Sequence, residues 1–344
     1  MANSIDLAKK FVPIIDGVYK AESVTNELDA AMRPDFMGVN EVKVLKVSTT
    51  GLGDYSRATG YPKGDVTAAW ETLTLTEERG KEISVDRMDD EETLGLTFGT
   101  VTGEFMRLHV IPELDAYRFA KYASTAGINR VASPAVLTKE TIIAAIDEAV
   151  RKLDADDVPL AGRRLYVNSD LKPILNAALS RQWGSDGAVN TVLAGYNDMP
   201  LTWVPKSRFY TALTLNDGTS NWGYTKTAPT YTVTAAEPAD WATNYTGYYT
   251  LSNGVYSKVT GASAPAWAAS TYYEKTAEGA SDINFMIIYP PAILQVVKVS
   301  LPKIFSPDIN QTKDAWKFQF REYHDAFVYE NKVKGIYSHY KPAG

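Results

Sequence analysis

The sequence predicts an α+β fold, because blocks of strand-like and helix-like hydrophobic patterning follow one another along its 344 residues. Apolar and polar residues alternate over residues 41–85, 293–299 and 316–323, as in half-buried strands. Between the first two blocks, apolar residues over 94–122 recur at intervals of three and four, as on one helix face. A hydrophobic content of 45% is enough for a sizeable core in two or three domains.

The first strand-like block predicts an extended hairpin around a tip, residues 49–64, that is rich in Gly, Thr and Asp. The strand residues on the two sides of this tip are Val42, Val44, Val47, Leu73, Leu75, Ile83 and Val85. For residues 1–40 we expect an extended arm with one short helix near residues 24–32. An isolated hairpin is not stable in water, so arm and hairpin are expected to lie on neighbouring copies of the chain.

A long helix is predicted from Asp86 to about Ala123. Acidic residues at its start suit the positive end of the helix dipole. Its apolar face consists of Leu94, Phe98, Val101, Phe105, Leu108, Ile111, Leu114 and Phe119. A helix of about 30 residues would be about 45 Å long. Pro112 removes one backbone hydrogen bond inside this helix, which predicts a kink.

The middle of the chain predicts a mixed α/β domain. Thr138 is expected to cap a helix with Ile142, Ile146, Val150 and Leu153 on one face, and Ser169 to cap a second helix with Pro173 in its first turn. Short strands are predicted at residues 165–167, 201–204, 283–289 and 336–340.

Residues 208–282 differ in composition, with three tryptophans, nine tyrosines and few charges. They predict a small inserted all-β domain of aromatic hairpins. The aromatic side chains have two interpretations. Either they form the core of a domain too small to make a larger one, or some rings are exposed and stack on sugars; the candidates for sugar binding are Trp241, Tyr249, Trp267 and Tyr273.

Composition argues against several classes of function. The absence of cysteine excludes disulfides, thiolate nucleophiles and sulfur-ligated zinc. The net charge of −6 argues against tight binding of nucleic acid through its phosphates. His109, His324 and His339 show no metal-ligand spacing. No catalytic, cofactor or metal site is therefore predicted, and neither a signal peptide nor a membrane span is expected.

Four segments carry a family resemblance. They are VSTTGLGDYSR at 47–57; WETLTL at 70–75, with ERG at 78–80 and ISVDRMDD at 83–90; IPELDAYR at 111–118; and YHDAFVYENK at 323–332, with GIY at 335–337. In this order they resemble the major capsid proteins of tailed bacteriophages with the Hong Kong 97-type (HK97-like) fold. The resemblance covers nearly the whole chain except the aromatic stretch.

The resemblance implies a domain assignment. The parts would be an N-terminal arm (1–40), an extended loop (41–85), the spine helix of the peripheral domain (86–130), an axial domain (131–207), the inserted domain (208–282), a return to the axial domain (283–295), peripheral strands (296–327), and a C-terminal axial strand and tail (328–344).

The resemblance also implies a structural protein that is not an enzyme and assembles with itself into pentamers and hexamers of an icosahedral shell. Expected partners are a separate scaffolding protein, a portal, packaged double-stranded DNA contacted without sequence specificity, and a possible decoration protein. The expected location is the virion head, assembled in the host cytoplasm. Residues expected at contacts between subunits are Tyr55, Arg57, Lys63, Trp70, Arg79, Arg87, Glu113 and Arg118.

Some related shells form a lysine–asparagine isopeptide bond, for which Lys63, Asn310 and the carboxylate of Glu322 are the nearest candidates, although their spacing departs from the family pattern. Two other interpretations of the chain stay open. One is an encapsulin-like compartment that stores an enzyme. The other is a sugar-binding tail or surface protein, which depends on the aromatic stretch alone.

Overall fold

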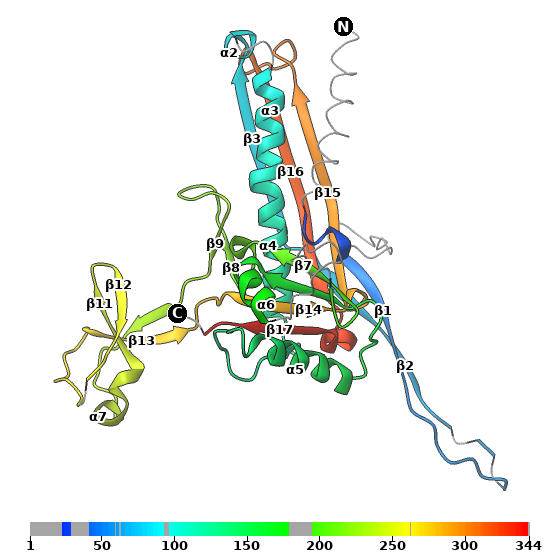
Figure 1. Ribbon diagram of the computed structural model, residues 1–344. Coiled ribbons are helices and arrows are strands. Elements are labelled where there is room, and N and C mark those ends of the chain that lie inside the picture. Colours follow the sequence, from blue (N-terminus) through cyan, green and yellow to red (C-terminus); the bar gives the residue numbers. More distant parts are fainter. Residues whose placement is uncertain are drawn as a thin grey trace, which may run out of the picture.

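The computed structural model describes residues 23–28, 41–58, 60–61, 63–92, 96–178, 195–261 and 263–342 (Figure 1). Most of the predicted N-terminal arm lies outside these residues. Of the short helix expected near residues 24–32, the described part is a 3-10 turn, η1 (Asn26–Leu28). No helix in the described ranges is long and apolar enough to cross a membrane.

The longest part of the molecule is a three-stranded antiparallel sheet with a helix along it (Figure 1). Its strands, in spatial order, are β15 (Ile293–Phe305), β16 (Ala315–Val328) and β3 (Glu77–Asp86). Half-buried side chains of β3, among them Ile83 and Val85, pack with the buried Phe318 and Phe320 of β16. These two β3 residues were expected in the hairpin, but they lie in this sheet, opposite residues of β16.

The range of the predicted long helix holds helical segments, with residues 93–95 outside the described ones. These are α2 (Arg87–Glu92), α3 (Leu96–Phe105), η2 (Met106–Val110) and α4 (Ile111–Ser124). The segment η2 is a π-helical turn, in which the backbone N–H of Ile111 donates to the carbonyl of Met106. Pro112 follows in the first turn of α4. The disruption expected at this proline is therefore a π turn just before it.

The second sheet is six-stranded, and its order is β4-β17-β14-β5-β7-β6. The strands are β4 (Asn129–Arg130), β17 (Ile336–Tyr340), β14 (Ile283–Ile288), β5 (Arg164–Asn168), β7 (Met199–Val204) and β6 (Gly195–Tyr196). All six residues of β14 are buried, as expected for a central strand covered on both faces. The four strands predicted for this region are confirmed.

Helices cover both faces of this sheet. On one face, α5 (Ile142–Ala155) and α6 (Lys172–Ala178) pack on side chains such as Val167 and Ile287. On the other face, α4 packs through Phe119 and Tyr122. Short 3-10 turns connect the elements: η3 (Ser169–Leu171), η4 (Lys206–Arg208), η6 (Pro290–Ala292) and η7 (Glu330–Gly335).

Both predicted helix caps were wrong by a few residues. Thr141 is the N-cap residue of α5, and Thr138 contributes its backbone carbonyl, which accepts from the N–H groups of Thr141 and Ile142. Asn168, not Ser169, caps the next helical segment, because its side chain accepts a 3.0 Å hydrogen bond from the N–H of Asp170. Side-chain capping groups are interchangeable over one or two positions in a sequence pattern.

The hairpin consists of β1 (Glu41–Thr49) and β2 (Val66–Thr74), paired without a register shift from Glu41 opposite Thr74 to Thr49 opposite Val66. It projects far from the two sheets (Figure 1).

On another side of the body, a small unit holds a four-stranded sheet of order β10-β13-β11-β12. Its elements are β10 (Thr230–Val233), α7 (Trp241–Asn244), η5 (Tyr245–Gly247), β11 (Tyr248–Ser252), β12 (Val255–Lys258) and β13 (Tyr272–Ala277). A two-stranded ribbon precedes this unit, β8 (Leu213–Leu215) with β9 (Tyr224–Lys226).

Candidate functional site

One face of the hairpin is an exposed apolar strip. Directly opposite residues share a face, and every second residue along a strand lies on that same face. The register therefore places Leu45 opposite Trp70 and Val47 opposite Ala68. Val66, two residues before Ala68 in β2, lies on the same face. Leu45 is 51% exposed and Trp70 is 62% exposed, and the other three are also exposed. Contiguous exposed apolar residues of this kind mark an interaction surface.

The opposite face of the hairpin lies on the body of the chain. Near the base, the buried side chains of Val42 and Leu73 pack with Leu294 and Val296 of β15. Further out, the amine of Lys46 is 2.5 Å from a carboxylate oxygen of Glu330. The hairpin is thus anchored on one face, and its apolar strip points away from that anchor.

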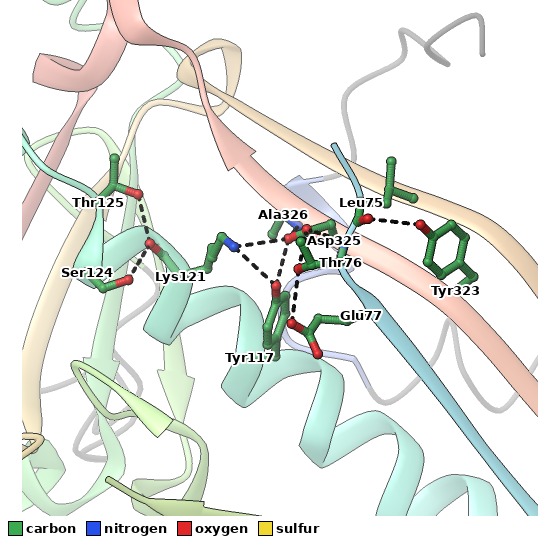
Figure 2. A network of polar contacts seen from close by, with 10 residues as sticks. All are labelled: Leu75, Thr76, Glu77, Tyr117, Lys121, Ser124, Thr125, Tyr323, Asp325 and Ala326. Carbon is green, nitrogen blue, oxygen red and sulfur yellow. Dashed lines mark hydrogen bonds and ion pairs between the residues drawn. The ribbon is translucent and has the colours of Figure 1, made fainter. Parts of the chain in front are cut away.

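The direction of the hairpin is fixed by a buried carboxylate at its base, Asp325 of β16 (Figure 2). One carboxylate oxygen accepts a 2.7 Å hydrogen bond from the hydroxyl of Tyr117 in α4. The other lies 3.1 Å from both the backbone nitrogen and the hydroxyl of Thr76, in the turn between β2 and β3. The amine of Lys121 lies 3.5 Å from the first oxygen. One side chain therefore connects the long helix, the long sheet and the root of the hairpin.

A second contact fixes the same turn. The hydroxyl of Tyr323 donates a 2.9 Å hydrogen bond to the carbonyl of Leu75 (Figure 2). Burial and the neighbouring Asp325 carboxylate raise the pKa of the Tyr117 hydroxyl, so Tyr117 stays a donor throughout the physiological range. Apart from the amine of Lys121, the donors at this joint are neutral hydroxyl and amide groups.

Another buried carboxylate, Asp115 of α4, holds the start of the described chain. It accepts hydrogen bonds from the hydroxyl of Ser23 at 2.8 Å, the N–H groups of Val24 and Thr25 at 3.0 and 3.2 Å, and the hydroxyl of Thr25 at 2.7 Å. The guanidinium of Arg208 lies 3.2 Å away. Charge-assisted bonds of this kind are the strong ones, so the segment before η1 is fixed to the long helix.

Arg118, predicted at a contact between subunits, is buried inside its own chain. Its side chain is 2% exposed and donates a 2.8 Å hydrogen bond to the hydroxyl of Thr25. The physical reason is that α4 is buried almost all round, between the two sheets and the segment at Thr25, so even its charged residues face protein.

Arg79 and Glu113 pair with each other inside the chain. The Nε atom of Arg79 lies 2.6 Å from a carboxylate oxygen of Glu113. The same guanidinium donates to the carbonyls of Asn216 and Gly223, at 2.7 and 3.3 Å. It thereby ties the β8–β9 ribbon to β3 and α4. This use of the pair is structural, so neither residue needs a neighbouring subunit to satisfy its charge.

Two titratable groups of β16, Glu322 and His324, are buried close to this pair. Burial raises the pKa of the Glu322 carboxyl to about 7; nearby Arg118 opposes the rise and Glu113 adds to it. Burial, with nearby Arg118, lowers the pKa of the His324 imidazole to about 3. Both groups are therefore held mainly in their neutral forms below neutral pH.

The remaining predicted contact residues are on the surface. Tyr55, Arg57 and Lys63 are exposed in the tip of the hairpin, and Tyr55 lies with its ring centroid 5.0 Å from that of Tyr61. Arg87 is at the far end of the long sheet, 3.8 Å from Asp308 and 3.9 Å from Asp314. The predicted residues thus fall into an exposed hairpin set and an internal set, with Arg87 apart from both at the end of the long sheet.

The residues considered for an isopeptide bond do not come together in the fold. The side chain of Asn310 bonds to its own loop, with its amide 2.9 Å from the carbonyl of Ala315. Glu322 lies seven residues along β16 from Ala315, about 23 Å at the rise of a strand, and only 4% of its surface is exposed. Glu322 therefore does not lie beside Asn310 of the same chain, which corrects that part of the prediction. A bond between Lys63 and Asn310 of two different copies stays a prediction.

The aromatic side chains proposed for sugar binding separate onto two sides of their sheet. Trp241 is 3% exposed and packs with Trp267, Tyr248 and Tyr272, so it is a core residue, because a unit this small has few other apolar side chains to bury. Its indole N–H is satisfied by the carbonyl of Pro265 at 3.0 Å. Tyr249 and Tyr273 are opposite each other on the other side of the sheet.

The sequence reasoning missed Asp115, Tyr117 and Asp325, which hold the joints described above. A signal was present, because Asp115 lies four residues after Ile111 and four before Phe119, a spacing that places it beside the apolar face of the helix. Buried carboxylates are retained only where donors surround them. No group of three or more His, Asp or Glu side chains in the described ranges is arranged to hold a metal ion.

Comparison of the fold with solved structures gives matches over most of the chain, although no protein-family model and no curated protein matches the sequence. A structure from Gordonia phage Cozz has a TM-score of 0.53 and 12% identity, with 94% of this chain and 87% of that chain covered. The capsid structure of the cyanophage P-SCSP1u has a TM-score of 0.50 and 10% identity, with 92% and 90% covered. A structure from Mycobacterium phage Bobi has a TM-score of 0.50 and 11% identity, with 94% and 91% covered.

The parts that the sequence resemblance implied are present: a long helix beside an elongated sheet, a second sheet with helices on both faces, and a projecting hairpin. The chain therefore has the Hong Kong 97-type fold of phage capsid proteins.

Proposed function

We propose that this chain is the major capsid protein of a tailed phage, which assembles with itself into an icosahedral shell around packaged double-stranded DNA. The observation that carries the proposal is the apolar strip of the hairpin, formed by Leu45, Val47, Val66, Ala68 and Trp70. Burying a large apolar side chain contributes about 1.5–3 kcal/mol. Exposing several on a projecting hairpin is costly unless a second molecule covers them.

The occupant of this strip is another copy of the chain. The hairpin is anchored by Asp325 and Tyr323 at an angle that carries the strip beyond its own sheets. A surface that reaches outward and cannot cover itself makes head-to-tail contacts, which close into rings when the rotation permits. Many such contacts of modest strength sum to a stable shell.

The structure supports a revised division of the chain into shell domains. We assign residues 41–74 to the extended loop, and place β3 with β15, β16 and the long helix in the peripheral domain, because β3 pairs with β16 along its whole length. The six-stranded sheet with α5 and α6 is the axial domain. The aromatic unit is a separate insertion with its own core around Trp241.

The partners in this proposal are further copies of the chain, a separate scaffolding protein and a portal, with a decoration protein as a possible addition. The acidic net charge of −6 suits a wall that DNA must not adhere to. The shell would be assembled in the host cytoplasm and become the virion head.

Electron microscopy of particles purified from cells that express the chain tests the proposal, with a scaffolding protein supplied where one is encoded beside it. Closed shells of uniform size that contain double-stranded DNA in the infected host support the proposal. Closed shells that enclose a protein cargo instead would assign the chain to a storage compartment. A chain that remains a monomer at every concentration would contradict the shell function altogether.

A further inference from the structure

The four-stranded sheet of the aromatic unit carries a second cluster of aromatic rings, on the side away from Trp241. Tyr231 of β10, Tyr249 of β11, Tyr256 of β12 and Tyr273 of β13 each contribute one ring. The strand register places them on one face, since Tyr249 is opposite Tyr273. All four are half-buried, so the cluster is reachable from solvent.

The rings of this tyrosine cluster contact one another across the whole sheet. Tyr231 and Tyr256 come from the two edge strands, yet their rings stack at 4.0 Å with an interplanar angle of 14°. Tyr231 also contacts Tyr249 at 4.9 Å, and Tyr256 contacts Tyr273 at 5.1 Å. Strands at opposite edges of a flat four-stranded sheet are about 14 Å apart, so the side chains lean together over a face that curls inward.

The hydroxyls distinguish this cluster from the core on the opposite face. In the core, the hydroxyl of Tyr272 donates to the carbonyl of Ala266 and that of Tyr245 donates to the carbonyl of Gly261. The hydroxyls of Tyr231, Tyr249, Tyr256 and Tyr273 have no hydrogen-bond partner among the described residues. These four hydroxyls are therefore free to exchange hydrogen bonds with a ligand.

Charge indicates what kind of ligand suits the cluster. Residues 229–279 contain two lysines, Lys258 and Lys275, and four acidic residues. Lys275 is already paired with Glu278 at 2.6 Å. Binding of nucleic acid or of an acidic polysaccharide gains most of its affinity from an excess of cations, and this unit has a net negative charge. The remaining chemistry consists of ring faces and hydroxyl groups.

We propose that the tyrosine cluster is a binding site for a neutral carbohydrate. The negatively polarised ring faces attract the C–H groups of a sugar ring, and the four hydroxyls exchange hydrogen bonds with its hydroxyls. A mostly aromatic surface with a few polar groups is the usual composition of a small-ligand site. The proposal is independent of shell assembly, because it concerns a unit with its own core.

Binding of the full-length chain to maltoheptaose, cellohexaose, chitohexaose and mannohexaose tests the proposal, with polygalacturonate and a single-stranded DNA oligonucleotide as anionic comparisons. The proposal expects saturable binding of at least one neutral oligosaccharide, measured by calorimetry. Tyr256→Ala should weaken this binding at least tenfold. The double variant Tyr249→Phe/Tyr256→Phe keeps the rings and should weaken it several-fold, because it removes two hydroxyls.

Trp222→Ala is the matched control, since this indole is also exposed but lies outside the unit. It should bind as the unchanged chain does. Melting temperature and circular dichroism report whether each variant is folded, and the phenylalanine variants decide the question if Tyr256→Ala unfolds the unit. Binding of none of the four neutral oligosaccharides, binding of the anionic probes alone, or undiminished binding by the folded variants would overturn the proposal.

Discussion

The hydroxyl of Tyr117 in the long helix lies 2.7 Å from the carboxylate of Asp325 in the long sheet, and the same carboxylate holds Thr76 at the root of the hairpin. The three elements are therefore fixed relative to one another within a single chain. A projecting hairpin can serve as a connector only if its direction is set before its partner arrives. Preorganisation of this kind lowers the entropic cost of association.

Removing the Asp325 carboxylate should destabilise the chain and loosen the hairpin. Asp325→Ala leaves Tyr117, Lys121 and the N–H of Thr76 without their buried acceptor, and we expect the free energy of unfolding to fall by about 3–5 kcal/mol. Chemical denaturation measures this loss. Hydrogen exchange should show faster exchange at the N–H of Thr76. Thr76→Val, which removes one hydroxyl, should cost only about 1 kcal/mol; an equal cost for both variants would contradict the central role of the carboxylate.

The apolar strip of the hairpin should be needed for assembly and not for folding. Leu45→Ser and Trp70→Ala change exposed residues, so the melting temperature of the subunit should change little. Each should lower the yield of closed shells at least tenfold, measured by sedimentation and electron microscopy. Val255→Ser is the control, because Val255 is similarly exposed outside the hairpin. Normal shells from both hairpin variants would show that this face is not an interface.

The tip of the hairpin gives a related expectation. Replacing Tyr55 or Arg57 with alanine should leave the circular dichroism spectrum unchanged and weaken the shells, because both side chains are exposed and far from the sheets. Dissociation of shells in increasing urea measures the effect. Variants whose shells dissociate at the same urea concentration as the unchanged chain would remove these residues from the interface.

Glu322 should make stability decrease as the pH rises toward neutrality. Its folded pKa of about 7 lies above the ordinary value of 4.5. The folded chain therefore holds the proton more tightly than the unfolded chain, and this stabilisation is complete below pH 4.5 and lost as the pH rises to about 7. A shift of this size corresponds to at most about 3 kcal/mol. Glu322→Gln should raise the free energy of unfolding at pH 8 and leave it nearly unchanged at pH 4.5.

His324 contributes with the opposite sign. Its folded pKa of about 3 is below the ordinary value of 6.5, so its contribution to stability is complete above pH 6.5 and lost as the pH falls toward 3. Between pH 4.5 and 6.5 the two effects oppose each other in the unchanged chain. Denaturation of Glu322→Gln across this interval should reveal a stability that rises with pH. A flat difference between the variant and the unchanged chain from pH 4.5 to 8 would contradict the assignment for Glu322. A variant whose stability does not rise between pH 4.5 and 6.5 would contradict the assignment for His324.

Two phenylalanines that pack together should differ in their importance for folding. Phe318 of β16 is completely buried, whereas Phe105 at the end of α3 is half-buried and packs against it from the helix. Phe318→Ala should cost about 3–5 kcal/mol of stability, and Phe105→Ala roughly half of that. The sequence pattern placed Phe105 on the apolar helix face, but it could not show that part of this side chain stays exposed to solvent. Denaturant unfolding of the two variants measures the difference.

Local patterning determined much of this fold. Alternation predicted the hairpin and the strands β15 and β16 of the long sheet, and the run of buried residues in β14 was recognisable as a central strand. Apolar residues that recur at intervals of three and four predicted the long helix up to Tyr122. These predictions succeeded because each depends on the face that a side chain presents within its own element. The aromatic stretch was also identified by composition, although composition could not separate its buried rings from its exposed ones.

The tertiary structure decided which elements lie together and therefore what each polar side chain does. Ile83 and Val85 continue the alternation of the hairpin, yet β3 pairs with β16, more than two hundred residues away. Arg118 and Trp70 occur in similarly recognisable segments, but one is enclosed between two sheets and the other is exposed on a projecting strand. The sequence by itself determined periodicity and composition. Burial was decided only by tertiary packing, because the side chains that enclose a residue come from distant parts of the chain.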